Sequence, residues 1–137
     1  MILLSKLEEL IDKLCPDGVE LKVVDGVCDI ITDYVAAGSF GEMAKRVKYK
    51  NSPDYALLVR TMDLKSNFTK GELVYIDENA FDFLWRVDLK CDAIILPNIG
   101  NCGEVYYVSA DKLPYKHCAL GPNAILVRSN SADMKYL

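Results

Sequence analysis

The amino-acid sequence predicts an α+β fold in which a mixed or antiparallel sheet carries short peripheral helices. Three observations favour this class. Short runs that are apolar or alternate between apolar and polar residues recur along the chain, separated by Gly, Pro, Asn or Asp. Helical spacing of apolar residues is confined to a few brief segments. The chain has 137 residues, of which 51% are apolar and 26% charged, which is enough for one domain with a real core.

The first element is predicted to be a helix. Ser5 and Glu8 have the S-x-x-E spacing of a capping box, which marks a helix start. Apolar residues follow at helical spacing until Pro16 and Gly18 end the pattern. These apolar positions are Leu7, Leu10, Ile11 and Leu14. Their face packs either on the domain itself or on a partner protein, and both alternatives stay open.

The next elements are mostly predicted strands. Residues 19–23 alternate strictly, as a half-buried strand does, and residues 56–59 form a continuous apolar run typical of a strand buried on both faces. Residues 33–54 lack a clear hydrophobic period. Val47 and Tyr49 alternate with lysines, which favours a strand in that part of the segment. The other predicted strands are residues 27–32, 73–76, 93–96, 105–108 and 124–127.

Two further helices are predicted. Asp77 is a plausible N-cap for a short helix whose apolar face is Phe81, Leu84 and Trp85. A second helix begins near Ser131 and has no C-cap. We therefore expect residues 1–137 to be a single domain that is cut from a longer chain; the alternative is a natural frayed terminus.

Composition narrows the classes of function. No run of about 20 apolar residues exists and the N-terminus lacks a signal-peptide pattern, so we expect a cytoplasmic protein without a membrane span. The five cysteines include no C-x-x-C pair, which favours reduced thiols over zinc or redox chemistry. The formal net charge is −4, whereas a free-standing nucleic-acid binder is usually basic. We expect neither a metal nor a cofactor.

Catalytic motifs are weak. His117 is the single histidine and lies beside Cys118, whereas a Cys-His enzyme needs its base close in space and a third group to orient it. The glycines around Cys102 could suggest a phosphate loop, but a strand-like segment follows instead of a helix. We therefore expect a protein that is not an enzyme.

Four stretches, in this order and spacing, resemble the target-recognition domain of a Type I restriction-modification specificity subunit. They are residues 7–19, 55–64, 92–103 and 120–125, so the resemblance covers essentially the whole chain. One departure is Cys91, which stands where that family often has glycine.

The resemblance implies sequence-specific recognition of double-stranded DNA. A full specificity subunit carries two such domains separated by long helices. Those helices hold two modification subunits, which methylate adenine with S-adenosylmethionine and connect to the restriction subunit. Each recognition domain reads one half of a split site. By this resemblance the chain would contain one recognition domain and be truncated before a C-terminal spacer helix. It would then be an excised fragment or a half-length subunit that pairs with a copy of itself. The alternative is an interaction module or decoy that binds modification subunits without reading DNA.

Candidate DNA-binding residues follow from side-chain chemistry. Arg60 has the paired donors that read guanine, and Asn98 and Asn101 have the paired donor and acceptor that read adenine. Asp63, which follows Arg60 at the polar end of the same predicted strand, is also included among the DNA-binding candidates. Residues suited to phosphates are Ser39, Lys45, Arg46, Lys48 and Lys50. Each has a structural alternative. Arg60 and Asp63 could pair to lock a turn, the asparagines could satisfy turn backbone, and the basic run could be a solvated edge strand.

Overall fold

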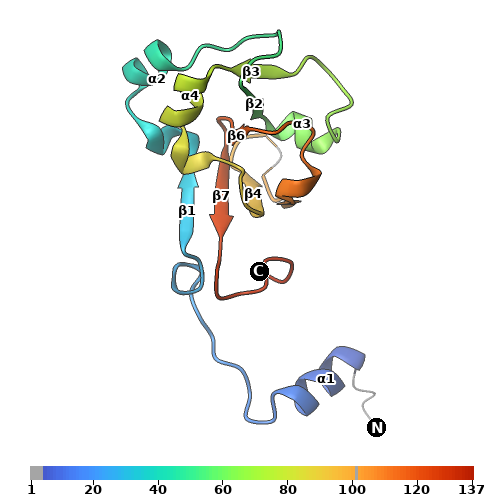
Figure 1. Ribbon diagram of the computed structural model, residues 1–137. Helices are drawn as coiled ribbons and strands as arrows, with labels where there is room; N and C mark the ends of the chain where they lie inside the picture. Colours follow the sequence, from blue (N-terminus) through green and yellow to red (C-terminus); the bar gives the residue numbers. More distant parts are fainter. Residues whose placement is uncertain (1–4, 101) are drawn as a thin grey trace.

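The computed structural model describes residues 5–100 and 102–137, and these form two small sheets (Figure 1). The first is antiparallel throughout, in the order β1–β7–β4–β5. The second has the order β3–β2–β6, with β2 antiparallel to β3 and parallel to β6. The strands are β1 (Ile30–Asp33), β2 (Ala56–Val59), β3 (Val74–Ile76), β4 (Ala93–Pro97), β5 (Tyr106–Val108), β6 (Cys118–Leu120) and β7 (Ala124–Arg128). The predicted α+β class is confirmed.

One hydrophobic core joins the two sheets. All four residues of β2 are buried, which explains why its sequence is continuously apolar and does not alternate. The largest fully buried apolar side chains come from both sheets and from the segment after β3. They include Leu57, Leu58, Ile76, Leu84, Ile95, Leu120 and Leu126.

Short helices surround the sheets, as predicted. The α-helices are α1 (Lys6–Leu14), α2 (Phe40–Arg46), α3 (Thr61–Lys65) and α4 (Glu78–Phe83). The 3₁₀ helices are η1 (Val24–Gly26), η2 (Tyr34–Ala37), η3 (Trp85–Val87) and η4 (Ala110–Lys112). The capping box of Ser5 and Glu8 and the N-cap of Asp77 are confirmed. No helix in the described part of the chain is both long and apolar enough to cross a membrane.

Helix α1 lies outside the body formed by residues 28–129. Figure 1 shows it at the end of an extended segment, and none of its residues is buried. Its apolar stripe is therefore open to solvent: Leu7, Leu10, Ile11 and Leu14 are all exposed. The helix is stabilised locally, by its capping box and by Lys13 in its last turn.

Several predicted elements were wrong. Residues 19–23 form no strand, and Leu21 is 98% exposed, because no neighbouring strand accepts their hydrogen bonds. Residues 131–137 form bends and a turn where a helix was predicted. Val47 and Tyr49 lie in no strand. Trp85 is 62% exposed, although its spacing placed it on the apolar face of a helix.

Hydrogen bonds hold the two ends of the body together. The N–H of Asp29 donates to the carbonyl of Arg128 at 2.9 Å, and β1 then pairs with β7 from Ile30 opposite Arg128. The hydroxyl of Ser129 donates to the carbonyl of Val27, and the N–H of Asn130 donates to the Asp29 carboxylate at 2.5 Å. The first and last residues of the body, near 28 and 129, therefore lie side by side.

Candidate nucleic-acid interface

Helix α2 lies within residues 33–54, the segment in which the sequence shows no clear hydrophobic period. Ser39 is its N-cap: the Ser39 hydroxyl accepts from the N–H of Glu42 at 3.3 Å, and the Glu42 carboxylate accepts from the N–H of Ser39 at 3.3 Å. Buried Met43 and Val47 fix the helix to the body. A Cβ at Gly38 would lie 2.9 Å from Cζ of Phe83, so a larger residue there would require the Phe83 ring to shift.

The C-terminal end of α2 presents three predicted phosphate ligands to one groove. Lys45, Arg46 and Lys48 line a hollow of about 750 Å³ between α2 and the region of α4 and η3. The guanidinium of Arg46 lies 5.0 Å from the ring centroid of Phe83, which holds it in place by a cation–π contact. The ammonium of Lys48 donates to the carbonyl of Ala44. The opposite wall includes Asp77 and Asp82, so the groove is mixed in charge.

The N-terminal end of α2 borders a second, more apolar hollow of about 300 Å³. Phe40, Tyr34 and Met43 line one part of it, and Asn98 and Ile99 from the loop between β4 and β5 line another. Phe40 is 84% exposed, so its ring is available for an apolar contact.

The loop side of this hollow carries two asparagines. The N–H of Asn98 donates to the carbonyl of Asn123 at 3.1 Å, so the loops before β5 and β7 support one another. Asn123 also lines the hollow, and its φ of 70° is a conformation that asparagine tolerates better than most residues. The structure therefore places predicted Asn98 at the hollow beside the N-terminal end of α2, which predicted Ser39 caps, whereas predicted Lys45, Arg46 and Lys48 line the separate groove at the C-terminal end of the helix. These two hollows together are called the α2 surface below.

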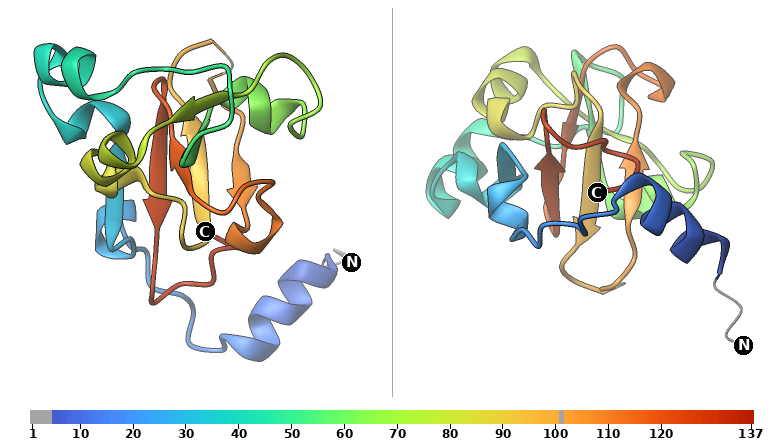
Figure 2. Two further views of the ribbon diagram at one scale, coloured as in Figure 1. Left: turned by 45° about the horizontal axis from the view of Figure 1, so that its top comes forward. Right: turned by 90° about the horizontal axis from the view of Figure 1, so that it is seen from below.

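Three other predicted residues lie elsewhere. Figures 1 and 2 show α3 on the opposite side of the body from α2. Arg60 and Asp63 lie at α3 and bind one another, and Asp63 is fully buried, which leaves its carboxylate no surface for DNA. Lys50 forms an ion pair with Asp54, and this pair together with the N–H of Tyr55 lowers the pKa of Asp54. Predicted Asn101 lies outside the described residues.

Sequence reasoning missed the apolar members of the α2 surface, Phe40, Tyr34 and Met43, and the asparagine Asn123. A signal for α2 was present, because Ser39 and Glu42 repeat the S-x-x-E spacing seen at Ser5 and Glu8. A helix predicted there would have placed the basic residues on one exposed end.

His117 and Cys118 are each engaged by neighbouring groups. The His117 ring stacks on the Tyr55 ring, with centroids 4.5 Å apart and planes 7° apart. Cys118 is buried, and its thiol donates to the carbonyl of Tyr115 at 3.3 Å. Among residues 5–100 and 102–137, no group of three or more His, Cys, Asp or Glu side chains is arranged to hold a metal ion.

Comparison with known proteins adds no assignment. No protein-family description, no curated protein and no solved structure matches the chain.

Proposed function

We propose that this chain is a DNA target-recognition domain of a Type I restriction-modification specificity subunit, acting in the bacterial cytoplasm without chemistry of its own. The observation that carries the proposal is the α2 surface, where one helix and its flanks carry predicted Ser39, Lys45, Arg46 and Lys48, and where predicted Asn98 lines the hollow at the N-terminal end of the same helix. The sequence resemblance supports the same function independently.

The α2 surface has the parts that base reading requires. Lys45, Arg46 and Lys48 supply cations for phosphates, which set the position of a protein on the duplex. Asn98 supplies an amide that can pair with adenine, and exposed Phe40 supplies an apolar contact for a thymine methyl group. The reading groups rest on a capped helix and on a loop bonded to its neighbour, which keeps them ordered.

The net charge of −4 implies that partners supply much of the affinity. In this proposal modification subunits, and through them the restriction subunit, provide further phosphate contacts and all of the chemistry. A half-length subunit would pair with a second copy to read both halves of a split site.

Selection from a random duplex pool at low salt tests the proposal, first with the chain alone and then with its modification subunits. Enrichment of a short fixed motif is expected. The K45Q/R46Q/K48Q variant should bind all sequences more weakly, and its salt dependence should flatten by about one unit of slope for each phosphate that it no longer binds.

The matched control is K70Q/K116Q/K135Q, which removes the same charge from exposed positions away from α2. Asn98→Ala should relax preference at one base pair by about 1–3 kcal/mol and leave the salt slope unchanged. Equal losses in the two triple variants, or no enriched motif in either setting, would contradict DNA reading at this surface.

A second candidate function is favoured by α1. Its exposed apolar stripe suits an interaction module or decoy that binds modification subunits without reading DNA. Leu10→Glu would then abolish capture of modification subunits, while the K45Q/R46Q/K48Q variant would still capture them. The DNA-reading proposal requires the second variant to fail in DNA binding.

A further inference from the structure

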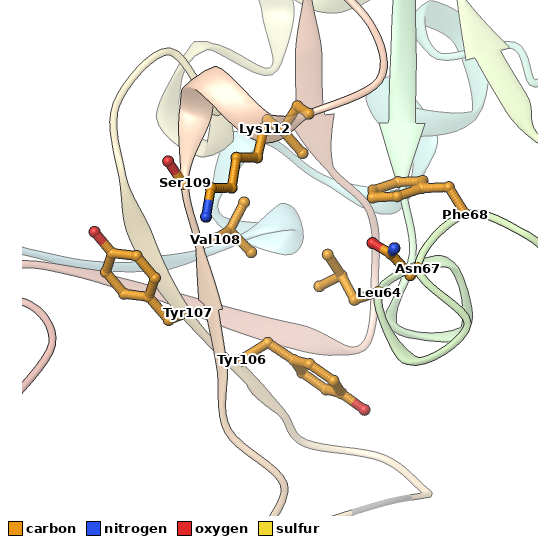
Figure 3. A pocket seen from close by; sticks show the side chains of 9 residues that line it. Leu64, Asn67, Phe68, Tyr106, Tyr107, Val108, Ser109 and Lys112 are labelled. Atoms are coloured by element: carbon orange, nitrogen blue, oxygen red, sulfur yellow. The ribbon is translucent and has the colours of Figure 1, made fainter.

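A third hollow lies on the side of the body that carries α3. It has a volume of about 230 Å³ and lies between the turn after α3 and the β5–η4 segment (Figure 3). Its apolar walls are Leu64, Phe68, Val108 and Leu113, and the rings of Tyr106 and Tyr107 border it. None of the predicted DNA-binding residues lines it.

Two polar side chains reach this hollow from opposite walls. Figure 3 shows the Asn67 amide beside Phe68 on one wall and the Lys112 side chain along the other. In the part of the chain that the structure describes, no carboxylate forms an ion pair with Lys112. The hollow therefore combines one uncompensated positive charge with an amide and an apolar interior.

The neighbouring carboxylates are already engaged. Glu104 binds the ammonium of Lys65 at 3.3 Å and accepts from the hydroxyl of Tyr106. Asp92 accepts from the hydroxyl of Tyr107 at 2.6 Å and from the N–H of Ala110 at 2.9 Å. These bonds fix the two tyrosines at the border, so the hollow is largely formed before any ligand binds.

Phe68 is held over the hollow at a conformational cost. Asn67 and Phe68 have φ values of 50° and 59°, and the left-handed region is unfavourable for phenylalanine. The N–H of Phe68 donates to the carbonyl of Asp63 at 2.7 Å, which ties the turn to α3. The tightly anchored α3 thereby sets the position of both Asn67 and Phe68.

We propose that this hollow binds a small planar organic monocarboxylate. The ammonium of Lys112 would pair with the carboxylate at one wall, and the Asn67 amide would lie against the ligand at the other. The ring would lie between the Phe68 side and the Val108 side.

The size of the hollow sets the ligand class. A cavity of about 150 Å³ accepts benzene, so a hollow of about 230 Å³ has room for one ring with a short acid group. A single cation matches a monoanion better than a phosphate dianion.

Titration of the full ¹⁵N-labelled chain with benzoate, followed by amide chemical shifts, tests this inference. Benzoate should shift residues 64–68 and 106–113. Benzamide, which has the same shape without the charge, should bind about tenfold or more weakly, because a hydrogen bond to a charged group is lost. Acetate, which has the charge without the ring, should also bind more weakly.

Lys112→Met keeps the length of the side chain and should weaken benzoate binding by about tenfold or more. Lys116→Met changes an exposed lysine outside the hollow and should leave it unchanged. Asn67→Gly, which accepts a positive φ, should also weaken binding while the amide spectrum stays folded.

Three results would overturn the inference: no shifts around the hollow, equal affinity for benzoate and benzamide, or full benzoate affinity in the Lys112→Met variant. The assay contains no DNA, so its failure leaves the proposed function untouched. Failure of DNA selection likewise leaves this site untouched.

Discussion

Arg60 and Asp63 form a two-point ion pair that closes the start of α3. Arg60 Nε lies 2.9 Å from Asp63 Oδ2, and Arg60 Nη2 lies 2.9 Å from Asp63 Oδ1. Asp63 also accepts the N–H of Arg60 at 2.9 Å, and Arg60 Nη2 donates to the carbonyl of Glu72 at 2.6 Å. The bond to Asp63 raises the pKa of Arg60. One guanidinium thus connects the end of β2, α3 and the segment before β3.

Removing the charge of Asp63 should therefore destabilise the body. Asp63→Asn leaves Arg60 without its counter-charge in a site where Asp63 is fully buried and the Arg60 side chain is 26% exposed. We expect the free energy of unfolding to fall by about 2 kcal/mol, measured by urea denaturation. Asp111→Asn, at an exposed position, should change it by less than about 0.5 kcal/mol. Equal stability of the two variants would show that the pair is not an anchor.

The stability of the body should not depend on α1. Leu10→Glu alters an exposed position in a helix without buried residues, so we expect the unfolding free energy to stay within about 0.5 kcal/mol of the parent value. Leu58→Ala, in fully buried β2, should lower it by about 2–5 kcal/mol. A marked loss in Leu10→Glu would mean that α1 packs on the body in solution.

Exposed and buried cysteines should react with a thiol reagent at different rates. Burial raises the pKa of the Cys118 thiol from 9.0 to about 11, whereas Cys91 and Cys102 are exposed. Two pKa units reduce the thiolate fraction at pH 8 by about a hundredfold. A thiol reagent should modify Cys91 and Cys102 rapidly and Cys118 only upon unfolding, as mass spectrometry of the labelled peptides would reveal. Fast labelling of Cys118 in the native protein would contradict its buried position.

Asp92 should contribute an acid-sensitive part of the stability. Hydrogen bonds from the Tyr107 hydroxyl and the Ala110 N–H lower the pKa of Asp92 below its ordinary value of 3.8. Its stabilising effect is therefore full above pH 3.8 and is lost as the pH falls through the lowered pKa of the folded state. Asp92→Asn should lower the melting temperature at pH 7, and the difference from the parent should shrink toward pH 3. A difference that stays constant over this range would exclude Asp92 as its source.

The elements predicted correctly from the sequence are those whose pattern is dictated by local burial. The apolar run of residues 56–59 and the hairpin strands around residues 93–108 appear as β2, β4 and β5. The alternation of residues 19–23 has the same local signal but gains no neighbouring strand, and a strand without a partner leaves its backbone unpaired. Tertiary pairing of this kind is not encoded in the segment itself.

The candidate site was predictable in its chemistry and not in its assembly. Lys45, Arg46 and Lys48 were proposed as phosphate ligands from their charge, yet their position relative to Asn98 depends on how α2 packs beside the β4–β5 loop. Arg60 shows a different outcome. The buried carboxylate of Asp63 accepts hydrogen bonds from the Arg60 guanidinium, and these are the donors that reading a guanine would require. Which alternative holds for such a pair depends on burial, and burial is a property of the folded chain.

The pairing of Ile30 with Arg128 has a consequence for how the body can be transplanted. The first strand, β1, is paired with the last strand, β7, and Ser129 and Asn130 form hydrogen bonds to Val27 and Asp29. The two ends of the body are therefore next to one another. Joining residues near 28 and 129 with a short linker and reopening the chain at exposed Gly103 would preserve both sheets. The same closeness of the two ends lets the body be inserted into a loop of an unrelated protein, since that protein needs only two attachment points that lie side by side.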